Sequence, residues 1–517
     1  MRQVRILWVD DEIGVLRPHI LFLTEKGFET DTCPSGNDAL RMLREKPYDI
    51  VFLDEHMPGL SGIETLRRIK AIRPSIPVVM ITKSEEEEIM DAAIGSQIAD
   101  YLIKPVRPQQ ILLTLKKILD TDDIVSRQTT SVFREEFSSI AAMISSADTF
   151  EQWCDLYRRL VFWQGELIRS ADTGMREVLK MQETDANRAF GKYISRNYTS
   201  WISAATGEKP LMSPAVMSKR IFPLIKKGSP LFLIVIDNMR LDQWQTIAMD
   251  LGSVMRTVSD ELYMSILPTA TQYSRNSLFS GMMPSAISES VPEYWINDNE
   301  EEGKNMFEEQ LIGKQMQRYG INCRWGYHKI SSEAEGRNIN DKLTQLLEND
   351  LTVLVYNFVD LLSHARTDIN VIRDMTGDEA SWLSLTHSWF IHSPLLELLR
   401  TVSSKGARIA VTTDHGSIRV QRPVKVVGDR QTSMNLRYKT GRNLDYNPRE
   451  VFEIVSPAKA GLPMSNITSR YIFAYASDFL VYPKNYNQIV THYRDSLQHG
   501  GISLQEMLLP FVVLEPV

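Results

Sequence analysis

Short apolar segments alternate with amphipathic stretches over the first 120 residues, and this alternation restricts the fold more than any other feature of the sequence. The apolar segments are RILWV (5–9), DIVFL (49–53), PVVMI (77–81) and YLI (101–103). They are rich in residues that suit buried strands, and the stretches between them have helical periodicity. Strands that alternate with helices in this way form a parallel sheet with helices on both faces. We therefore predict a small α/β domain at residues 1–120.

The composition is that of a globular, multidomain protein. The 517 residues exceed the ~100–200 residues of a typical domain. The net charge of −7 provides no general attraction to nucleic acid. Three widely spaced cysteines disfavour a disulfide framework and a thiolate zinc site. The early aspartates argue against a secretory signal, and every apolar run is far shorter than the ~18 residues of a membrane span. We expect a soluble, cytoplasmic protein.

Two further regions follow the first domain. Residues 121–208 carry an amphipathic helical stripe that includes Trp153, Tyr157 and Trp163, so we predict a helical connector domain with a packed core. Residues 209–517 return to α/β alternation. Their candidate strands are LFLIVI (231–236), TVLVYNFV (352–359) and ARIAVTT (407–413).

Polar residues follow the predicted strands of the first domain. They are Asp10 and Asp11, Asp54, Thr82 and Lys104. Because the carboxyl ends of parallel strands meet at one edge of a sheet, these side chains are expected to converge there. Three converging carboxylates need a cation, and Mg²⁺ prefers oxygen ligands. Asp54 could then attack phosphorus while Lys104 pairs with the phosphoryl group. Any single aspartate would more often be a helix cap or turn residue.

This set, together with Tyr101 and Lys104-Pro105, resembles the receiver domain of two-component response regulators, which has a flavodoxin-like fold. The resemblance implies that a sensor histidine kinase phosphorylates Asp54. It also implies Mg²⁺ at the Asp10/Asp11 pair, Asp54 and the backbone carbonyl of His56, with Thr82 and Tyr101 as the switch. One departure from the family is Lys83, where a small residue is usual.

The C-terminal region repeats the pattern with different ligand types. Asp237, Asp360 and the pair Asp414-His415 follow its predicted strands. His364 lies four residues after Asp360, which places both on one face of a helix if a helical turn begins there. His499 lies in a late His-Gly-Gly turn. Carboxylates mixed with imidazoles suit zinc or manganese better than magnesium.

A nucleophile for this second site is expected in Pro268-Thr269-Ala270-Thr271. A threonine hydroxyl needs a metal or a base to become reactive at neutral pH. Two metal ions could activate this hydroxyl and stabilise the leaving oxygen. Taken alone, each threonine or histidine here would more often be a cap or a core residue, and the strands do not decide between Thr269 and Thr271.

The ordered set of Asp237, the PTAT segment, DxxxH, DHG and the late HGG resembles the alkaline phosphatase superfamily, most closely its PglZ-type branch, across roughly 210–517. This resemblance implies an alkaline-phosphatase-like α/β domain with a mainly parallel sheet. It implies one zinc ion at Asp360, His364 and His499, and a second at Asp237, Thr271, Asp414 and His415. The segment PTATQYSRNSLFSGMMPS is similar to the nucleophile segment of nucleotide pyrophosphatase/phosphodiesterases and selects Thr271. In-line attack by Thr271 would form a phosphothreonyl intermediate that is then hydrolysed.

Basic residues are concentrated between Gly416 and Leu444. This stretch could be a track for a polyanion, with Tyr438 stacking on a base. A solvated surface or pairing with acidic groups of the same chain is an equally good interpretation. The expected substrate contacts are Arg275, Asn276, Lys425, Arg437 and Tyr438.

The whole arrangement of receiver, helices and PglZ-type domain resembles the PorX-like response regulators, a family linked to type IX secretion. The resemblance implies a phosphodiesterase that acts on nucleotide or oligonucleotide signals. It also implies a homodimer that forms on phosphorylation, and a sigma factor or secretion component as a further partner. The alternative is a catalytically silent metal-binding scaffold that signals through protein contacts. A DNA-binding output is less favoured, because no helix-turn-helix is recognisable.

Overall fold

The computed structural model describes residues 4–73, 76–83, 98–119, 121–170, 173–203, 209–296, 305–428, 432–464 and 468–517. The chain divides into two compact units, Met1–Ser131 and Val132–Val517, which are described here separately. Among the described residues, no helix combines the length and apolar character needed to cross a bilayer.

The first unit is an open parallel sheet with strand order β2-β1-β3-β4-β5, in which every pairing is parallel. Successive side chains of a strand point to opposite faces. Accordingly, Leu7 and Val9 belong to one apolar cluster, and Ile6 and Trp8 belong to another. This confirms the predicted flavodoxin-like α/β fold. The elements are β1 (Arg5–Val9), α1 (Ile13–Glu25), β2 (Glu29–Cys33), α2 (Gly36–Glu45), β3 (Ile50–Asp54), α3 (Gly62–Ile72), β4 (Val78–Thr82), β5 (Asp100–Ile103) and α5 (Pro108–Leu119).

Three long helices follow: α6 (Thr121–Ser146), α7 (Phe150–Arg169) and α8 (Thr173–Ser203). Helix α7 begins at a capping box formed by Thr149 and Gln152, which satisfies backbone donors of its first turn. The predicted apolar stripe of α7 is buried, and Trp153 packs edge-on against Phe190 of α8. The same apolar cluster continues into the C-terminal sheet. The helices from Val132 onward and the sheet therefore share one core.

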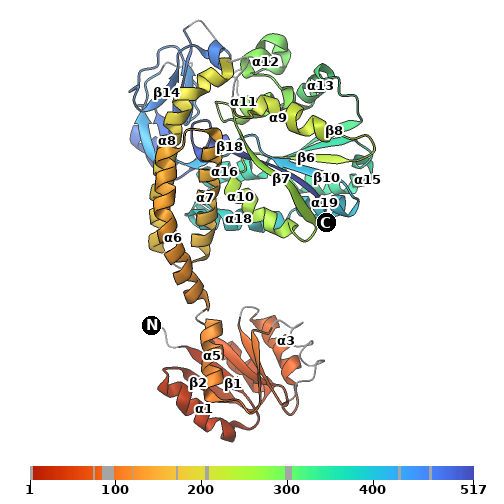
Figure 1. The fold of residues 1–517 in the computed structure, drawn as a ribbon, viewed down its shortest axis with the longest axis vertical. Helices are drawn as coiled ribbons and strands as arrows, with labels where there is room; N and C mark the ends of the chain where they lie inside the picture. The colour runs from red at the N-terminus through yellow and green to blue at the C-terminus, as the bar shows by residue number, and fades with distance from the viewer. Residues whose placement is uncertain are drawn as a thin grey trace. The chain divides into compact units, whose positions relative to one another are not determined.

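The second unit contains a six-stranded sheet of order β7-β18-β10-β6-β9-β8, with helices on both faces (Figure 1). Its β10-β6, β6-β9 and β9-β8 pairings are parallel, whereas β18 runs antiparallel to both of its neighbours, β10 and β7. All six residues of β6 are buried, as expected for a strand covered on both faces. The strands are β6 (Leu231–Ile236), β7 (Met255–Met264), β8 (Trp325–Ile330), β9 (Leu351–Tyr356), β10 (Arg408–Thr412) and β18 (Leu508–Pro516).

The helices around this sheet include those that carry the candidate site. They are α9 (Ser213–Val216), α10 (Leu241–Ala248), α11 (Thr271–Ser280), α12 (Pro284–Ser290), α13 (Glu308–Arg318), α14 (Glu333–Asp341), α15 (Leu343–Leu346), α16 (Phe358–Asp368), α17 (Asn370–Met375), α18 (Glu379–His392), α19 (Pro394–Ser404), α20 (Tyr486–Tyr493) and α21 (Leu504–Met507).

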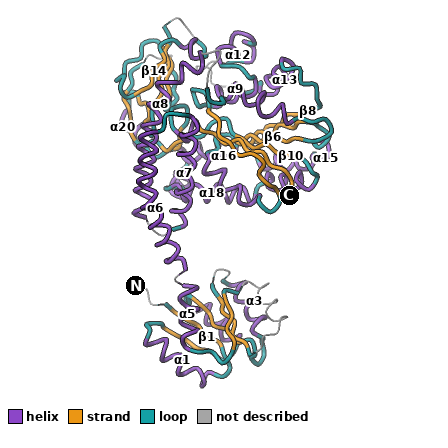
Figure 2. The backbone as a smooth tube through the Cα atoms, in the orientation of Figure 1, coloured by secondary structure: helices purple, strands orange, loops and turns teal. Residues whose placement is uncertain are grey.

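Short strands form three small sheets beside the main one, and Figure 2 shows the strands around β14 set apart from the main sheet. The pairings are β11-β17, β12-β16 and β13-β15-β14. The strands are β11 (Ile418–Arg419), β12 (Arg422–Lys425), β13 (Tyr438–Gly441), β14 (Val451–Ile454), β15 (Arg470–Ala474), β16 (Asp478–Val481) and β17 (Leu497–Gln498). The predicted basic stretch therefore contributes three of these short strands, β11, β12 and β13.

Candidate functional site

The first candidate site lies at the carboxyl ends of β1, β3 and β5. Lys104 Nζ lies 2.9 Å from Asp10 Oδ2 and 2.9 Å from Asp54 Oδ2, so one ammonium group bridges two buried carboxylates. Asp10 Oδ1 also accepts a hydrogen bond of 2.9 Å from the backbone N–H of Glu12. Burial raises the pKa of Asp54, although the nearby lysine opposes that shift. The ion pair with Lys104 thus offsets part of the cost of burying the ionised Asp54 carboxylate.

The same edge has the ligand set that a divalent cation needs. Carboxylate oxygens of Asp10, Asp11 and Asp54 lie within 4.8 Å of one another. Asp54 Oδ1 is buried without a hydrogen-bond partner among the described residues. Unpaired oxygens from several carboxylates are the donors that Mg²⁺ prefers. These residues therefore fit a magnesium ion.

The remaining predicted receiver residues differ in how exposed their side chains are. Thr82 is buried at the end of β4, close in the sheet to Asp54. Tyr101 lies on β5 with 40% of its surface exposed, and Lys83 and the His56 side chain are also exposed. Their roles in switching and in magnesium binding stay predictions.

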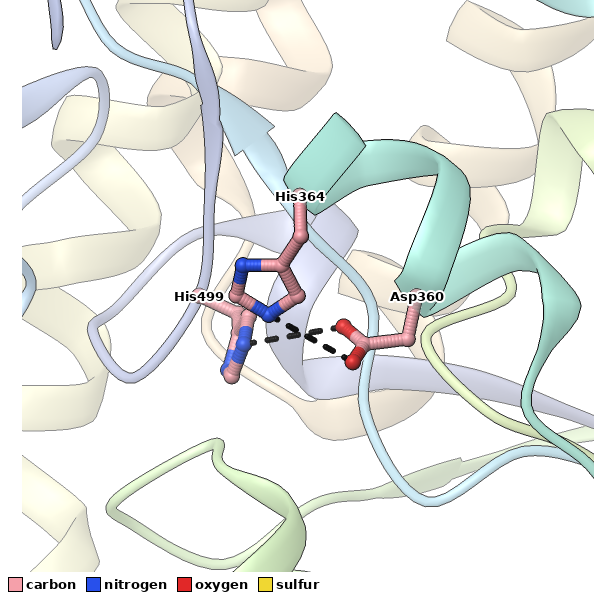
Figure 3. Close-up of side chains that lie close together, drawn as sticks. All are labelled: Asp360, His364 and His499. Carbon is pink, nitrogen blue, oxygen red and sulfur yellow. Dashed lines mark ion pairs between the residues drawn. The ribbon is translucent and has the colours of Figure 1, made fainter. Parts of the chain in front are cut away.

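In the second unit, Asp360, His364 and His499 form one potential ligand group (Figure 3). Asp360 and His364 lie four residues apart on α16, with His364 Nε2 3.5 Å from Asp360 Oδ2. His499 approaches from a different segment, with Nε2 3.8 Å from Asp360 Oδ1. Asp360 was expected at the end of a strand, but β9 ends at Tyr356 and α16 begins at Phe358. The early helix places both side chains on one face.

Asp237, Asp414 and His415 form a second group, and all three are buried. His415 Nε2 lies 3.7 Å from Asp237 Oδ1 and 3.7 Å from Asp414 Oδ2. Neither of these carboxylate oxygens has a hydrogen-bond partner among the described residues. Buried carboxylates are costly without cations, and Arg275, whose Nη1 lies 3.7 Å from Asp414 Oδ2, supplies a single positive charge against the two. The group therefore fits a metal ion.

Hydrogen bonds orient both buried imidazoles. His415 Nδ1 lies 3.2 Å from the carbonyl oxygen of Gly416, and His499 Nδ1 lies 3.2 Å from that of Thr269. A carbonyl can only accept, so each Nδ1 carries the proton and each Nε2 presents a lone pair. Burial lowers the pKa of His415 and lowers that of His499 to about 3. Both rings are thus neutral and ready to bind a metal through Nε2.

The structure distinguishes the two candidate threonines. Thr269 is fully buried; its hydroxyl donates to the carbonyl of Gly501 and accepts from the N–H of Gly500, each at 3.0 Å. It therefore fixes the turn that carries His499. Thr271 is the first residue of α11 and is partly exposed, whereas the rest of that helix is buried. Its Oγ1 lies 3.0 Å from His415 Nε2, within reach of the ligand group.

Arg275 is a counter-ion inside the site. It lies one helical turn after Thr271 and is buried. Its Nη1 is 2.8 Å from Asp237 Oδ2, and its Nε is 2.6 Å from Glu308 Oε1. Glu308 in turn pairs with Lys329 at 3.3 Å. Arg275 was expected to contact substrate, but its nearest partners are carboxylates of the protein. Asn276 is also buried.

Asn238 links the two ligand groups, and the sequence analysis did not identify it. Its side-chain amide donates to Asp360 Oδ1 at 3.1 Å, and its backbone N–H donates to Asp414 Oδ1 at 3.4 Å. The residue has a φ of 62°, a left-handed conformation that asparagine tolerates better than most residues. In the sequence, only its position directly after Asp237 could have indicated that Asn238 belongs to the site.

The predicted basic track is largely paired within the chain. Arg437 is fully buried in an ion pair with Glu506, so it has no free surface for substrate. Tyr438 is also buried, packed edge-on against Tyr273, and cannot stack on a base. Arg422 pairs with Asp478 and Glu450. Of the expected contacts from this stretch, only Lys425 is exposed. Arg430 lies outside the described residues.

Comparison with protein families identifies each region. The model described as "BREX system PglZ alkaline phosphatase-like domain" matches residues 216–514, more than half of the chain. The chain belongs to the PglZ family. The models for the PorX response regulator linker domain and the response regulator receiver domain match residues 123–202 and 6–116 of this PglZ-family chain. The three matches confirm the predicted PorX-like fusion.

Curated proteins and solved structures similar to this chain include matches that cover about a quarter of it. Transcriptional regulatory protein ZraR of Escherichia coli O157:H7 is 34% identical over 137 residues, which cover 26% of this chain and 31% of that protein. ResD of Bacillus subtilis is 32% identical over 117 residues, 23% of this chain and 48% of that protein. A receiver domain structure from Clostridium thermocellum is 30% identical with a TM-score of 0.22, covering 23% of this chain and 98% of the other. The chain thus spans about a third to a half of these curated relatives.

Proposed function

We propose that this PglZ-family response regulator is a phosphorylation-controlled phosphodiesterase that uses Thr271 as its nucleophile. One observation carries the proposal: the rings of His415 and His499, one from each ligand group, stack with centroids 4.2 Å apart. The two groups are therefore neighbours, and Thr271 Oγ1 lies 3.0 Å from the His415 Nε2 atom. A hydroxyl beside two adjacent ligand groups is the arrangement that two-metal phosphoryl transfer requires.

The ligand types support two zinc ions, with manganese as the alternative. Asp360, His364 and His499 would hold one ion, and Asp237, Thr271, Asp414 and His415 the other. When bound, these ions would lower the pKa of the nucleophilic hydroxyl and stabilise charge on the phosphoryl and leaving oxygens.

The chain's own residues supply position and charge. Thr271 Oγ1 forms the new bond to phosphorus while the bond to the leaving alcohol breaks, and water then hydrolyses the phosphothreonine. Its place at the start of α11 favours an anionic substrate, because the positive end of a helix dipole lies at its N-terminus. Arg275 holds the Asp237 carboxylate from the buried side of the same helix. Asn238 keeps Asp360 and Asp414 in register with each other.

In the receiver, we propose that Asp54 accepts a phosphoryl group from a sensor histidine kinase, with Mg²⁺ held by Asp10, Asp11, Asp54 and the His56 carbonyl. Lys104 already pairs with Asp54 and can follow the added phosphoryl oxygens. Thr82 and Tyr101 would then change conformation in response to phosphorylation.

We further propose that phosphorylation promotes a homodimer, and that the output regulates type IX secretion with a sigma factor or secretion component as partner.

Nucleotide or oligonucleotide diesters are the proposed substrates. Purified protein should contain about two equivalents of zinc or manganese in the second unit. It should hydrolyse bis(p-nitrophenyl) phosphate together with short RNA or cyclic oligonucleotides. Metal-loaded protein that turns over none of these substrates would instead favour the silent scaffold.

A further inference from the structure

A cavity of about 460 Å³ is separate from the proposed metal site, because its walls contain neither Thr271 nor any residue of the two ligand groups. Helices α7 and α8 form one wall. The other wall includes Arg240, Asp242, the start of α18, Ile418, Arg419, Gln421 and Gln505. Its volume falls in the ~300–1,000 Å³ range of small-molecule sites.

Several buried polar atoms in the cavity wall have no hydrogen-bond partner among the described residues. They are Tyr157 Oη, Arg176 Nε, Arg419 Nη2 and Gln505 Oε1. Buried polar groups in folded proteins are normally paired, so a cluster of unpaired ones indicates a missing partner. The two arginine nitrogens can only donate, the glutamine oxygen can only accept, and the tyrosine hydroxyl can do either. A molecule that satisfies them must carry both hydrogen-bond acceptors and donors.

The charges of the wall restrict the ligand further. Six carboxylates and four basic side chains line the cavity. Glu379 is bridged by Arg240 at 2.6 Å and by Arg419 at 2.8 Å, so its charge is already compensated. Even with Glu183 protonated, the five remaining carboxylates outnumber the four basic side chains and oppose a phosphate or other anion. A cation would face Arg176, Arg419 and Lys180. A neutral ligand avoids both the repulsion of an anion by the carboxylates and the repulsion of a cation by these basic side chains.

Apolar side chains complete the wall and suit a flat ring. Tyr157, Val161 and Ile168 of α7 line one side, and Leu179 and Ile418 lie on others. We propose that this cavity binds a neutral heterocyclic molecule of nucleoside size, which presents donors and acceptors on its edge and an apolar face to α7. This is a ligand site separate from the proposed phosphodiesterase site.

Two residues of the cavity wall pack closely against the loop that carries Asp414 and His415. Gly416 directly follows His415, and a Cβ placed on it would lie 2.1 Å from the carbonyl oxygen of Gln505 and 3.4 Å from Arg240 Cγ. Both of these neighbours also line the cavity. Binding that shifts Arg240 or Gln505 would therefore press on the loop that carries Asp414 and His415. The ligand is positioned to modulate the metal site without entering it.

Calorimetric titration of the full-length protein with adenosine, guanosine, cytidine and uridine tests the proposal. At least one nucleoside should bind, and more tightly than its 5′-monophosphate. Thr184→Trp, which fills the cavity from α8, should weaken that binding by about tenfold or more. Met181→Trp on the same helix is the control, because Met181 is 69% exposed and does not line the cavity. It should leave affinity unchanged.

Arg176→Met provides a second variant that keeps the size of the side chain and removes one unpaired donor; it should weaken binding by a smaller factor. No binding of any nucleoside at millimolar concentration would overturn the proposal and leave a solvent-filled cavity. Binding that resists Thr184→Trp would place the ligand elsewhere. Tighter binding of the monophosphate, lost in Thr184→Trp, would mark an anion site and contradict the charge argument.

Discussion

The imidazole rings of His415 and His499 stack with their centroids 4.2 Å apart and their planes at 19°. One ring follows strand β10, and the other sits in a glycine-containing turn near the end of the chain. Each donates its Nδ1 proton to a backbone carbonyl, which leaves both Nε2 atoms available as ligands. This contact brings the two ligand groups together.

Thr271→Val should abolish diester hydrolysis, with a fall of more than about 10³-fold in kcat, because valine keeps the shape and removes the nucleophilic oxygen. Metal content measured by mass spectrometry should remain near two equivalents, since six of the seven proposed ligands persist. Thr401→Val, at an exposed hydroxyl on α19, is the matched control and should keep full activity. Retained hydrolysis in Thr271→Val would eliminate this residue as the nucleophile.

Asn238→Gly should weaken metal binding by about 10–100-fold, because the amide that orients Asp360 is lost. Glycine accepts the positive φ of this position, so the change tests the amide without adding backbone strain. Competition with a chromophoric chelator measures the affinity. Asn349→Gly, outside the site, is the control. Equal affinities for the Asn238 variant and the unmodified protein would show that the amide does not support the metal ligands.

Arg275→Met should destabilise the metal-free protein by about 3–5 kcal/mol, since Asp237 and Glu308 lose a buried counter-ion. Zinc should restore part of this loss because the ion also neutralises Asp237. Urea denaturation with and without a chelator measures both effects. If the variant were equally destabilised in both conditions, Arg275 would stabilise Glu308 and the fold without contributing to the charge balance of the metal site.

Glu183 makes stability depend on pH. Burial, together with Glu379 and Asp242, raises its pKa to about 8, while Arg240 and Lys180 oppose the shift. The folded state therefore binds a proton that the unfolded state releases near pH 4.5, and stability falls as pH rises from that value through about 8. Glu183→Gln should remove this dependence and stabilise the protein at pH 8.5 by about 1–2 kcal/mol. Thermal unfolding between pH 5 and 8.5 measures it, and identical pH profiles would contradict the assignment.

Asp54→Asn should prevent labelling by acetyl phosphate and any phosphodonor-induced shift to a dimer, because an amide cannot accept the phosphoryl group. Sedimentation velocity with and without phosphodonor provides the measurement. Glu45→Gln, at an exposed carboxylate of the same unit, should respond like the unmodified protein. A phosphodonor-dependent shift that survives in Asp54→Asn would mean that another group controls assembly.

The architecture was largely predictable because local pattern and global fold agree. Apolar runs such as 5–9 and 231–236 became fully or mostly buried strands, and the α7 stripe became core. The end of β9 was less predictable. The apolar run continues to Val359, but the chain turns into α16 at Phe358, and apolar character alone does not separate a buried strand from a buried helix start.

The basic stretch shows where sequence reasoning was weakest. An arginine next to a tyrosine is typical of a nucleic-acid-binding surface. In the structure, however, Arg437 pairs with Glu506 and Tyr438 packs against Tyr273. Their partners come from distant segments, and a charge along the chain does not reveal which acid will lie beside it. For the same reason the sequence named Arg275 as a candidate but did not reveal its pairing with Asp237.

The sequence by itself determined the kinds of chemistry available, because carboxylates and imidazoles that directly follow buried strands can only emerge at a sheet edge. The sequence therefore predicted the types of metal ligand and the candidate phosphorylation site Asp54. It also predicted that a threonine of the segment 268–271, between Asp237 and Asp360, is the nucleophile. Only the tertiary structure decided which threonine is accessible, which arginine is a counter-ion, and that His415 and His499 meet. Those outcomes depend on contacts between segments far apart in the chain, which packing selects and local sequence does not encode.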